Sequence, residues 1–183
     1  MTGIAQHETL MPETPTTTPP DPVGALNPHL FRDGMSRVAG AVHIVATDGP
    51  SGRAGFTATA VAPVTDQPAS LLVCVNAAGR SAQSVLANRA FCVNTLSAGD
   101  QAVAETFAGC AGLEGRDRFS VGSWETLETG CPVLATGLVA FDCRLTESRV
   151  IATHFVMIGE IVAIRLGRTV PALVYCNRSY HAL

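Results

Sequence analysis

Three strand-like runs lie within residues 42–76, VHIVATDGPSGRAGFTATAVAPVTDQPASLLVCVN. The first run, residues 42–47, is rich in β-branched side chains, and residues 54–65 alternate small, hydroxyl and apolar side chains. Between them, residues 48–52 form a cluster of Asp, Gly, Pro and Ser that is typical of a turn. Residues 71–76 add a nearly continuous apolar strand. This part of the chain therefore predicts a β-hairpin followed by a third strand.

Short helices and further strands are predicted along the rest of the chain. Asn27 followed by Pro28 is a typical helix start, and we expect that helix to end near Gly40. Two more helices are expected over residues 81–88 and 101–107, and strands over residues 91–96, 137–147, 150–165 and 172–176. The regular alternation of strands and helices that marks a parallel sheet is missing. We therefore predict a mainly β (α+β) fold, a small antiparallel barrel with short peripheral helices.

The N-terminal residues differ in composition from the rest of the chain. Residues 1–25 hold five of the eleven prolines, interleaved with Thr, and show no apolar periodicity. This composition predicts a disordered leader. Residues 26–183 are expected to form one domain.

The overall composition limits the class of protein. The 183 residues are 47% hydrophobic and 15% charged, with a formal net charge of -3. This length and hydrophobic content predict one soluble globular domain with an ample core. The charged fraction is below the roughly 25% of an average globular protein, so we expect a second copy of the chain to cover apolar surface in a homodimer. Because no basic run is present, the chain does not fit an electrostatic nucleic-acid binder.

All 12 basic residues are Arg, and the chain contains no Lys. This excludes a P-loop protein, whose Lys reaches the phosphates, and a pyridoxal-phosphate enzyme, whose Lys forms the Schiff base. It also excludes a protein kinase, which needs the Lys of its third strand. The His, Cys and carboxylate residues form no cluster at metal-ligand spacing, so no metal site is expected.

The cysteines and the apolar stretches bear on cellular location. The six cysteines show no C-x-x-C spacing and four lie in apolar runs, so we expect small buried side chains in a reducing compartment. The chain starts without the basic and apolar regions of a secretory signal. The longest nearly uncharged stretch, residues 54–79, contains Pro63, Asp66 and Pro68, which excludes a membrane helix there. We expect a cytoplasmic protein without membrane or nucleic-acid partners.

The triplet Gly49, Gly52 and Gly55 invites comparison with a dinucleotide-binding fingerprint. That fingerprint needs a helix directly after the glycine turn, with its N-terminus facing the pyrophosphate. Here a strand follows, and a hairpin turn is therefore the favoured interpretation.

Residues 55–61, GFTATAV, are the first candidate for ligand contact. On a strand, Thr57 and Thr59 share one face and Ala58 and Ala60 share the other. Small side chains let a flat ligand approach the backbone, and the hydroxyls can hydrogen-bond a polyol or a phosphate. Thr is also an ordinary strand residue, so a purely structural role is the alternative.

Residues 76–84 are the second candidate for ligand contact. Asn76 ends a strand, and Arg80 and Ser81 open a helix that carries Ser84 one turn later. A helix N-terminus offers free N–H groups and the positive end of the helix dipole, and with an Arg beside it this place suits an anion. The alternative is a plain helix capped by Ser81.

Several motifs resemble one known family. They are FCVNTLSAG (residues 91–99), GCPVL (130–134), VAFDCRL (139–145), THFVMIGEI (153–161) and NRSYHAL (177–183), together with residues 31–76. On these motifs the chain is similar, from residue 31 to residue 183, to the flavin reductase family with the FMN-binding split-barrel fold. The likeness is strongest to the flavin reductases of pyrimidine utilisation, followed by the small components of two-component aromatic hydroxylases.

The resemblance implies a homodimeric Greek-key split β-barrel that reduces free FMN, or FAD, with NADH or NADPH. The reduced flavin would then diffuse to a partner monooxygenase. Hydride would pass from C4 of the nicotinamide to N5 of the flavin, and because both atoms belong to cofactors, no acid–base pair of the protein is required. The alternatives are a split-barrel oxidase that retains its FMN and a non-catalytic flavin-binding module.

The resemblance also implies a set of site residues. His154 matches the family histidine beside the nicotinamide and is the catalytic candidate; a hydrogen-bonded core histidine is the alternative. The flavin would contact Thr47, Thr57, Ala58, Thr59, Ala60, Val61, Asn76, Arg80, Ser81, Ser84, Arg178 and Tyr180, with its phosphate near Arg80, Ser81 and Ser84. The family often has Gly-Asp before the histidine, where this chain has Ala152 and Thr153. No role is therefore carried over from that acid.

Two further features have more than one interpretation. His43, between Val42 and Ile44, is expected to be structural or interfacial. The charged side chains within the Gly-rich residues 108–122 predict either a solvated loop or a lid over the nicotinamide site; they are Glu114, Arg116, Asp117 and Arg118.

Overall fold

The computed structural model of the protein describes residues 26–183, and the predicted leader, residues 1–25, lies outside them. The helices are α1 (Pro28–Ser36), α2 (Arg80–Asn88) and α3 (Gln101–Ala108), with 3₁₀ turns η1 (Ala98–Asp100) and η2 (Gly115–Ser120). The strands are β1 (Gly40–Ala41), β2 (His43–Thr47), β3 (Ala54–Ala58), β4 (Val61–Asp66), β5 (Ala69–Asn76), β6 (Ala90–Thr95), β7 (Trp124–Thr126), β8 (Pro132–Leu134), β9 (Val139–Ile151), β10 (His154–Leu166), β11 (Leu173–Cys176) and β12 (Ser179–Ala182).

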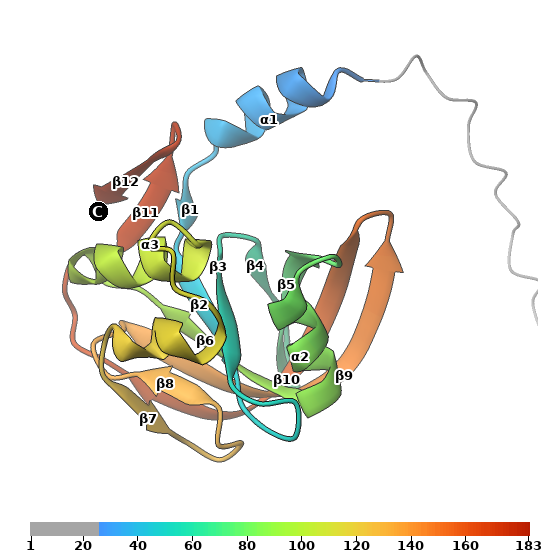
Figure 1. Ribbon diagram of the computed structural model, residues 1–183, viewed down its shortest axis with the longest axis vertical. Coiled ribbons are helices and arrows are strands. Elements are labelled where there is room, and N and C mark those ends of the chain that lie inside the picture. Colours follow the sequence, from blue (N-terminus) through green and yellow to red (C-terminus); the bar gives the residue numbers. More distant parts are fainter. Residues whose placement is uncertain (1–25) are drawn as a thin grey trace, which may run out of the picture.

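The main sheet has seven antiparallel strands in the order β3-β2-β6-β9-β10-β5-β4. This confirms the predicted mainly β antiparallel fold with short peripheral helices. The sheet curls into an open barrel that hydrogen bonds do not close, and β3 and β4, although consecutive in the chain, are its two edges (Figure 1). We call the gap between β3 and the end of β5 the seam, and α2 lies beside it (Figure 1).

Two apolar clusters cover the two faces of β2, which is why all five of its residues are buried. Val45 packs inside the barrel with the buried face of α2 and with Phe91 and Met157. Ile44 and Ala46 point to the other face, where α3 and the aromatic side chains near η2 cover them. Strand β2 is therefore packed from both sides, and the edge strand β3 pairs with it along its whole length.

Strand β10 bends where it passes the core. Its register with β9 shifts between Ile158 and Gly159. A Cβ on Gly159 would lie 2.5 Å from Cζ of Phe91, so only glycine allows this close approach. The bend lets β10 cross beneath the barrel and still pair with β5 at the seam.

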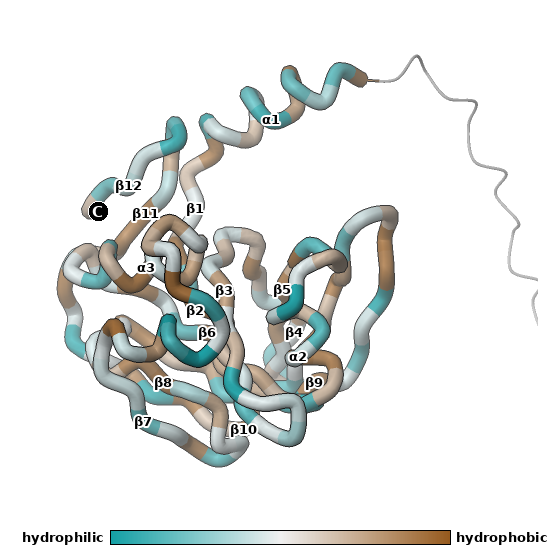
Figure 2. Tube along the Cα trace, in the orientation of Figure 1, coloured by the Kyte–Doolittle hydropathy of each residue, from teal (hydrophilic) through white to brown (hydrophobic). Residues whose placement is uncertain are grey.

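Helix α1 projects from the body of the protein (Figure 1) and buries none of its residues against the rest of the described chain. Asn27 caps it by accepting a hydrogen bond from the N–H of His29, as expected. The helix ends at Ser36, before the predicted Gly40, because Gly40 already pairs with β11. Phe31 and Met35 are 57% and 52% exposed, and apolar segments alternate with polar ones along the helix (Figure 2).

Two predicted strands are divided differently in the structure. The prediction of one strand over residues 54–65 is wrong, because the chain leaves β3 after Ala58 and enters β4, at the other edge of the sheet, at Val61. The prediction of a strand from residue 150 is also wrong, because Val150 and Ile151 belong to β9. The β9–β10 hairpin turns at Ala152, which has a left-handed φ of 50°.

The cysteines follow the prediction only in part. All six are free thiols, and Cys92, Cys131 and Cys143 are buried, but Cys110 is exposed. Cys110 follows the end of α3, where it has no core to enter. No helix within residues 26–183 is long and apolar enough to cross a membrane.

Candidate active site

Three cavities follow β3 along the seam. The Arg80 cavity, about 510 Å³, lies at the start of α2; the His154 cavity, about 380 Å³, lies between β3 and the end of β5; and the Tyr180 cavity, about 230 Å³, lies beside β11 and β12. Neighbouring cavities share lining residues. Phe56, Val75 and Asn76 belong to the first two, and Thr57, Ala58, Thr59 and Ala108 to the last two. Together they form one groove, the seam cleft, of a size usual for small-molecule sites.

The Arg80 cavity contains the start of α2. Arg80 is the first residue of the helix, and within the described chain no side chain caps the helix by a hydrogen bond at Gly79. The interpretation of Ser81 as the cap is therefore wrong: its hydroxyl donates to the carbonyl of Gly55 in β3 at 3.0 Å. Ser81 fixes the helix to the edge strand. The first N–H groups of the helix lie at the positive end of its dipole, which favours an anion.

Three arginines and one carboxylate line the Arg80 cavity. Arg53 is paired with Asp48 at 2.8 Å and lies over the ring of Phe119. Arg118 donates to the carbonyls of Leu113 and Phe107, at 3.0 and 3.2 Å, and so anchors the η2 segment to the end of α3. These contacts hold the cleft wall in place without neutralising the charge of Arg118.

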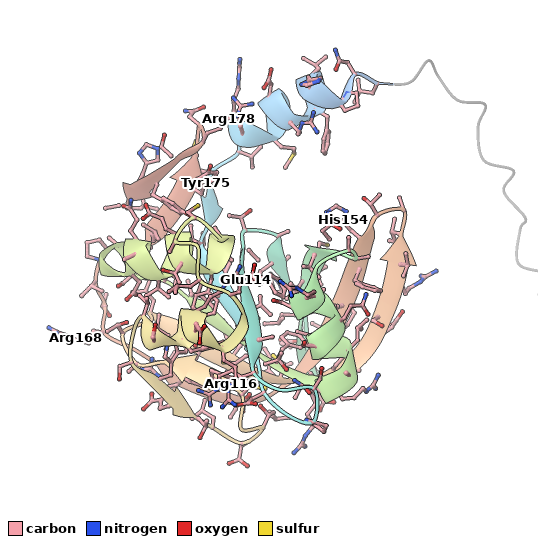
Figure 3. The ribbon with its side chains drawn as sticks, in the orientation of Figure 1. Glu114, Arg116, His154, Arg168, Tyr175 and Arg178 are labelled. Carbon is pink, nitrogen blue, oxygen red and sulfur yellow. The ribbon has the colours of Figure 1, made fainter. Side chains whose placement is uncertain are left out.

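The remaining cation, Arg80, donates to Glu114 at 2.8 Å, and both side chains are exposed at the rim of the cavity. The solvated-loop interpretation of residues 114–118 is wrong for Arg118, which is half-buried and bonded to backbone carbonyls, whereas Glu114 is exposed and also lines the cleft. That interpretation describes Arg116 and Asp117, which are exposed. Figure 3 shows Glu114 near the middle of the molecule, away from His154.

In the His154 cavity, β3 and the residues after it contribute Phe56 and a run of small side chains, and Phe107 of α3 lies beside them. Thr57 uses its hydroxyl to donate to the carbonyl of Ala104 in α3 at 2.7 Å. Ala58 and Ala60 line the cavity opposite Cys74 and Asn76. Thr59 follows the end of β3 and is exposed, so the predicted two-faced strand is interrupted there. Because Ala58 and Ala60 have short side chains, a flat ring could lie close to the backbone at these residues.

His154 opens β10 and lies opposite Asn76 in the ladder with β5. It is exposed and lines the cavity, so the interpretation as a core histidine is wrong. Its Nδ1 lies 2.9 Å from the hydroxyl of Thr153, which leaves Nε2 as the nitrogen for a ligand. Figure 3 shows the side chain at the top of β10, beside the β9–β10 hairpin.

Three residues of the predicted flavin set lie outside the cleft. Thr47 is fully buried, and its hydroxyl donates to the carbonyl of Ala90 and accepts from Asn88. Val61 packs partly buried against the core from β4. Arg178 pairs with Asp33 of α1 and lies above Tyr175, away from Glu114 and His154 (Figure 3).

Tyr180 lines the last of the three cavities. Its ring lies 5.0 Å from that of Tyr175, and burial raises the pKa of its hydroxyl. His43, predicted to be structural or interfacial, is buried with Nδ1 3.1 Å from the hydroxyl of Thr95. Burial lowers the pKa of His43 to about 4. It is therefore a structural residue of the protomer.

Several cleft residues have no sequence pattern that marks them. Arg53, Arg118 and Tyr175 come from three separate segments and meet only in the folded chain. The cleft thus combines a cationic end, a wall of small residues and an exposed histidine. This arrangement fits a flat ring with an anionic tail at α2, and leaves room for a second ring near His154.

Comparisons with known proteins agree with this geometry. Residues 35–183 match the family model of the flavin reductase like domain. The chain is 46% identical over 159 residues to FMN reductase (NADH) RutF of Ancylobacter novellus, with 87% of each protein covered. A structure from Haemophilus somnus 129pt, described as that of a candidate flavin reductase, has a TM-score of 0.82 at 44% identity, covering 86% of this chain and 100% of that one. BorF, the flavin reductase component of a bacterial two-component tryptophan halogenase, has a TM-score of 0.80 at 26% identity, covering 86% and 98%.

Proposed function

This chain belongs to the flavin reductase family, and we propose that it reduces free FMN with NADH in the seam cleft. One observation carries the proposal. A cationic helix start and an exposed histidine lie in neighbouring cavities of one groove, which alanines help to line. When both substrates are bound, hydride passes from C4 of the nicotinamide to N5 of the flavin.

The residues of the chain bind and orient the two rings in this proposal. Arg80 and Ser84, with the first N–H groups of α2, hold the flavin phosphate. Ala58 and Ala60 let the flavin ring lie against β3. His154 orients the nicotinamide through Nε2, because its Nδ1 is engaged by Thr153. Placing the two rings in contact is the main contribution that the protein makes to such a reaction.

Reduced FMN leaves the cleft for a separate monooxygenase. The openness of the site supports this step: Asn76, Arg80 and His154 are all exposed. The similarity to a reductase component of a two-component halogenase supports it as well. The free thiols of all six cysteines suit a reducing compartment, and we place the protein in the cytoplasm.

A homodimer is part of the proposal. Its support is the apolar face of α1, whose Leu30 and Phe31 are 63% and 57% exposed although α1 is an ordered helix. A face of this kind marks a protein interface, and a second copy of the chain is the occupant we propose. The turn before β12 contacts the end of α1 through the Arg178–Asp33 ion pair and through the N–H of Asn177, which donates to the carbonyl of Ser36.

The proposed function is tested by NADH oxidation with a catalytic amount of protein. We expect turnover only when free FMN is added in excess. Turnover without added flavin but with an organic substrate would instead indicate an oxidase that retains its FMN. Tight FMN binding without NADH oxidation would indicate a non-catalytic flavin-binding module. Either result would overturn the proposal.

A further inference from the structure

The ion pair between Arg80 and Glu114 crosses the mouth of the Arg80 cavity. Nη2 of Arg80 donates to Oε2 of Glu114 at 2.8 Å, and the side chains are 87% and 73% exposed. Arg80 belongs to α2, whereas Glu114 precedes η2, 34 residues later in the chain. The pair therefore joins the two walls of the cleft at its rim.

The backbone beside Glu114 is fixed while its side chain is free to move. Nε of Arg118 donates to the carbonyl of Leu113, the preceding residue, at 3.0 Å. Arg118 also binds the carbonyl of Phe107 at the end of α3. Glu114 is therefore held next to Arg80 by the fold, and only its exposed side chain must rotate to break the pair.

The charges of the cavity do not favour a phosphate while this pair is intact. Arg53 is neutralised by Asp48 and Arg80 by Glu114, which leaves Arg118 as the lining cation without a carboxylate partner in the described chain. A phosphate monoester carries a charge of about -1.5 to -2 near pH 7. A phosphate at the start of α2 needs the guanidinium that Glu114 occupies.

We propose that Glu114 is an internal competitor for the phosphate of the flavin. It binds Arg80 in the free protein and must release Arg80 when FMN enters, which lowers affinity for phosphorylated flavin and leaves affinity for riboflavin unchanged. The inference rests on the proposed function. The competition keeps the affinity of the cleft for FMN low, which suits an enzyme whose reduced flavin product must leave.

A purely structural role of the pair does not explain its position. Exposed ion pairs contribute little to folding stability, because both charges stay hydrated and the side chains lose entropy. The anchoring of this segment is already supplied by Arg118. The competition therefore predicts an effect of Glu114 on FMN binding without a change in thermal stability.

The test is a fluorescence titration of the full chain with FMN and with riboflavin. Glu114→Gln should bind FMN about two- to five-fold more tightly than the wild type at low salt, with no change for riboflavin. Asp117→Asn removes the same charge from the same segment but leaves the pair intact, and it should bind both flavins like the wild type. The gain should shrink at high salt, where exposed charges are screened.

An Arg80→Ala background completes the experiment. In this background Glu114→Gln should no longer tighten FMN binding, because no guanidinium is left to be released. If Glu114→Gln raises FMN affinity as much in the Arg80→Ala background as in the wild type, Glu114 repels the phosphate directly. If Glu114→Gln and the wild type bind FMN equally well, Glu114 does not compete with the phosphate. Either result overturns the inference. NADH oxidation by the wild-type protein is measured separately. Its absence would contradict the proposed function, whereas the flavin titrations test the inference.

Discussion

Asn76 and His154 face each other as cross-strand partners at the open end of the β5–β10 ladder. Side chains directly opposite in an antiparallel pair lie on the same face of the sheet. The carboxamide oxygen of Asn76 accepts from the N–H of Ala78, and Nδ1 of His154 is engaged by Thr153. Within residues 26–183, Nδ2 of Asn76 and Nε2 of His154 have no such partner, and both line the His154 cavity.

Replacement of His154 tests its orienting role. His154→Asn should raise the KM for NADH and lower kcat/KM about ten- to hundred-fold, a difference of about 1.4 to 2.7 kcal/mol. FMN affinity should stay nearly constant, because the phosphate is held in the Arg80 cavity, which His154 does not line. Steady-state kinetics with each substrate varied in turn measure both effects.

His181→Asn is the matched control, since His181 is exposed in β12 and lines none of the three cavities of the cleft. Its kinetics should equal those of the wild type. Unchanged kinetics of His154→Asn with both substrates would assign His154 no part in the reaction.

Replacement of Arg80 tests the location of the phosphate. Arg80→Ala should weaken FMN binding by about ten-fold or more, because a hydrogen bond to a charged group contributes about 1.5 to 3 kcal/mol. Riboflavin, which lacks the phosphate, should bind as before. Arg116→Ala removes an equal charge from an exposed position that lines none of the three cavities, and it should change neither affinity. An equal loss for FMN and riboflavin in Arg80→Ala would place the phosphate elsewhere.

The fold could be predicted from sequence where its signals are local. The β2–β3 hairpin has a turn cluster at residues 48–52 between two strand-like runs, and the hairpin formed as expected, although its second strand ends at Ala58. The β9–β10 hairpin has no Gly or Pro at its turn, and Ala152 adopts a left-handed conformation that only the long ladder on both sides enforces. Its turn was therefore missed.

The site could be predicted only where one segment supplies several of its parts. Arg80, Ser81 and Ser84 share the first turns of α2, and all three line the same cavity. Arg118 and Tyr175 come from other segments and carry no pattern of their own. Thr47 shows the opposite failure: the family resemblance placed it against the flavin, but its strand is buried on both faces and its hydroxyl donates to the carbonyl of Ala90.

The buried imidazole of His43 predicts a pH dependence of stability. Burial lowers its pKa to about 4, from 6.5 in the unfolded chain. Between these values the unfolded chain takes up a proton that the folded chain does not, so the free energy of unfolding falls as the pH falls from 6.5 toward 4. From about pH 7 to about pH 5 the loss due to this residue is about 2 kcal/mol.

Chemical denaturation of wild type and His43→Gln at the two pH values measures this contribution. The variant should lose less stability on acidification by about that amount. His181→Gln, which changes an exposed ring, should behave like the wild type. The same acid-induced loss in His43→Gln and wild type would show that His43 does not take up a proton on unfolding.

The apolar face of α1 predicts the oligomeric state. Light scattering at micromolar concentration should give a mass of about twice the 19.0 kDa of one chain. Phe31→Asp with Met35→Asp should give a folded protomer, because neither side chain is buried within one copy. Gln83→Asp adds a carboxylate to an exposed position of α2 and should remain dimeric. A wild-type mass of one chain would contradict the homodimer.

Anaerobic reduction of excess FMN tests the transfer of hydride to a free flavin most directly. Without oxygen, reduced FMN accumulates, and the visible absorbance of oxidised flavin falls as NADH is consumed. We predict many FMN molecules reduced per protein chain, with one NADH oxidised for each. Reduction that stops at one FMN per chain, or NADH consumption without loss of flavin absorbance, would contradict the account.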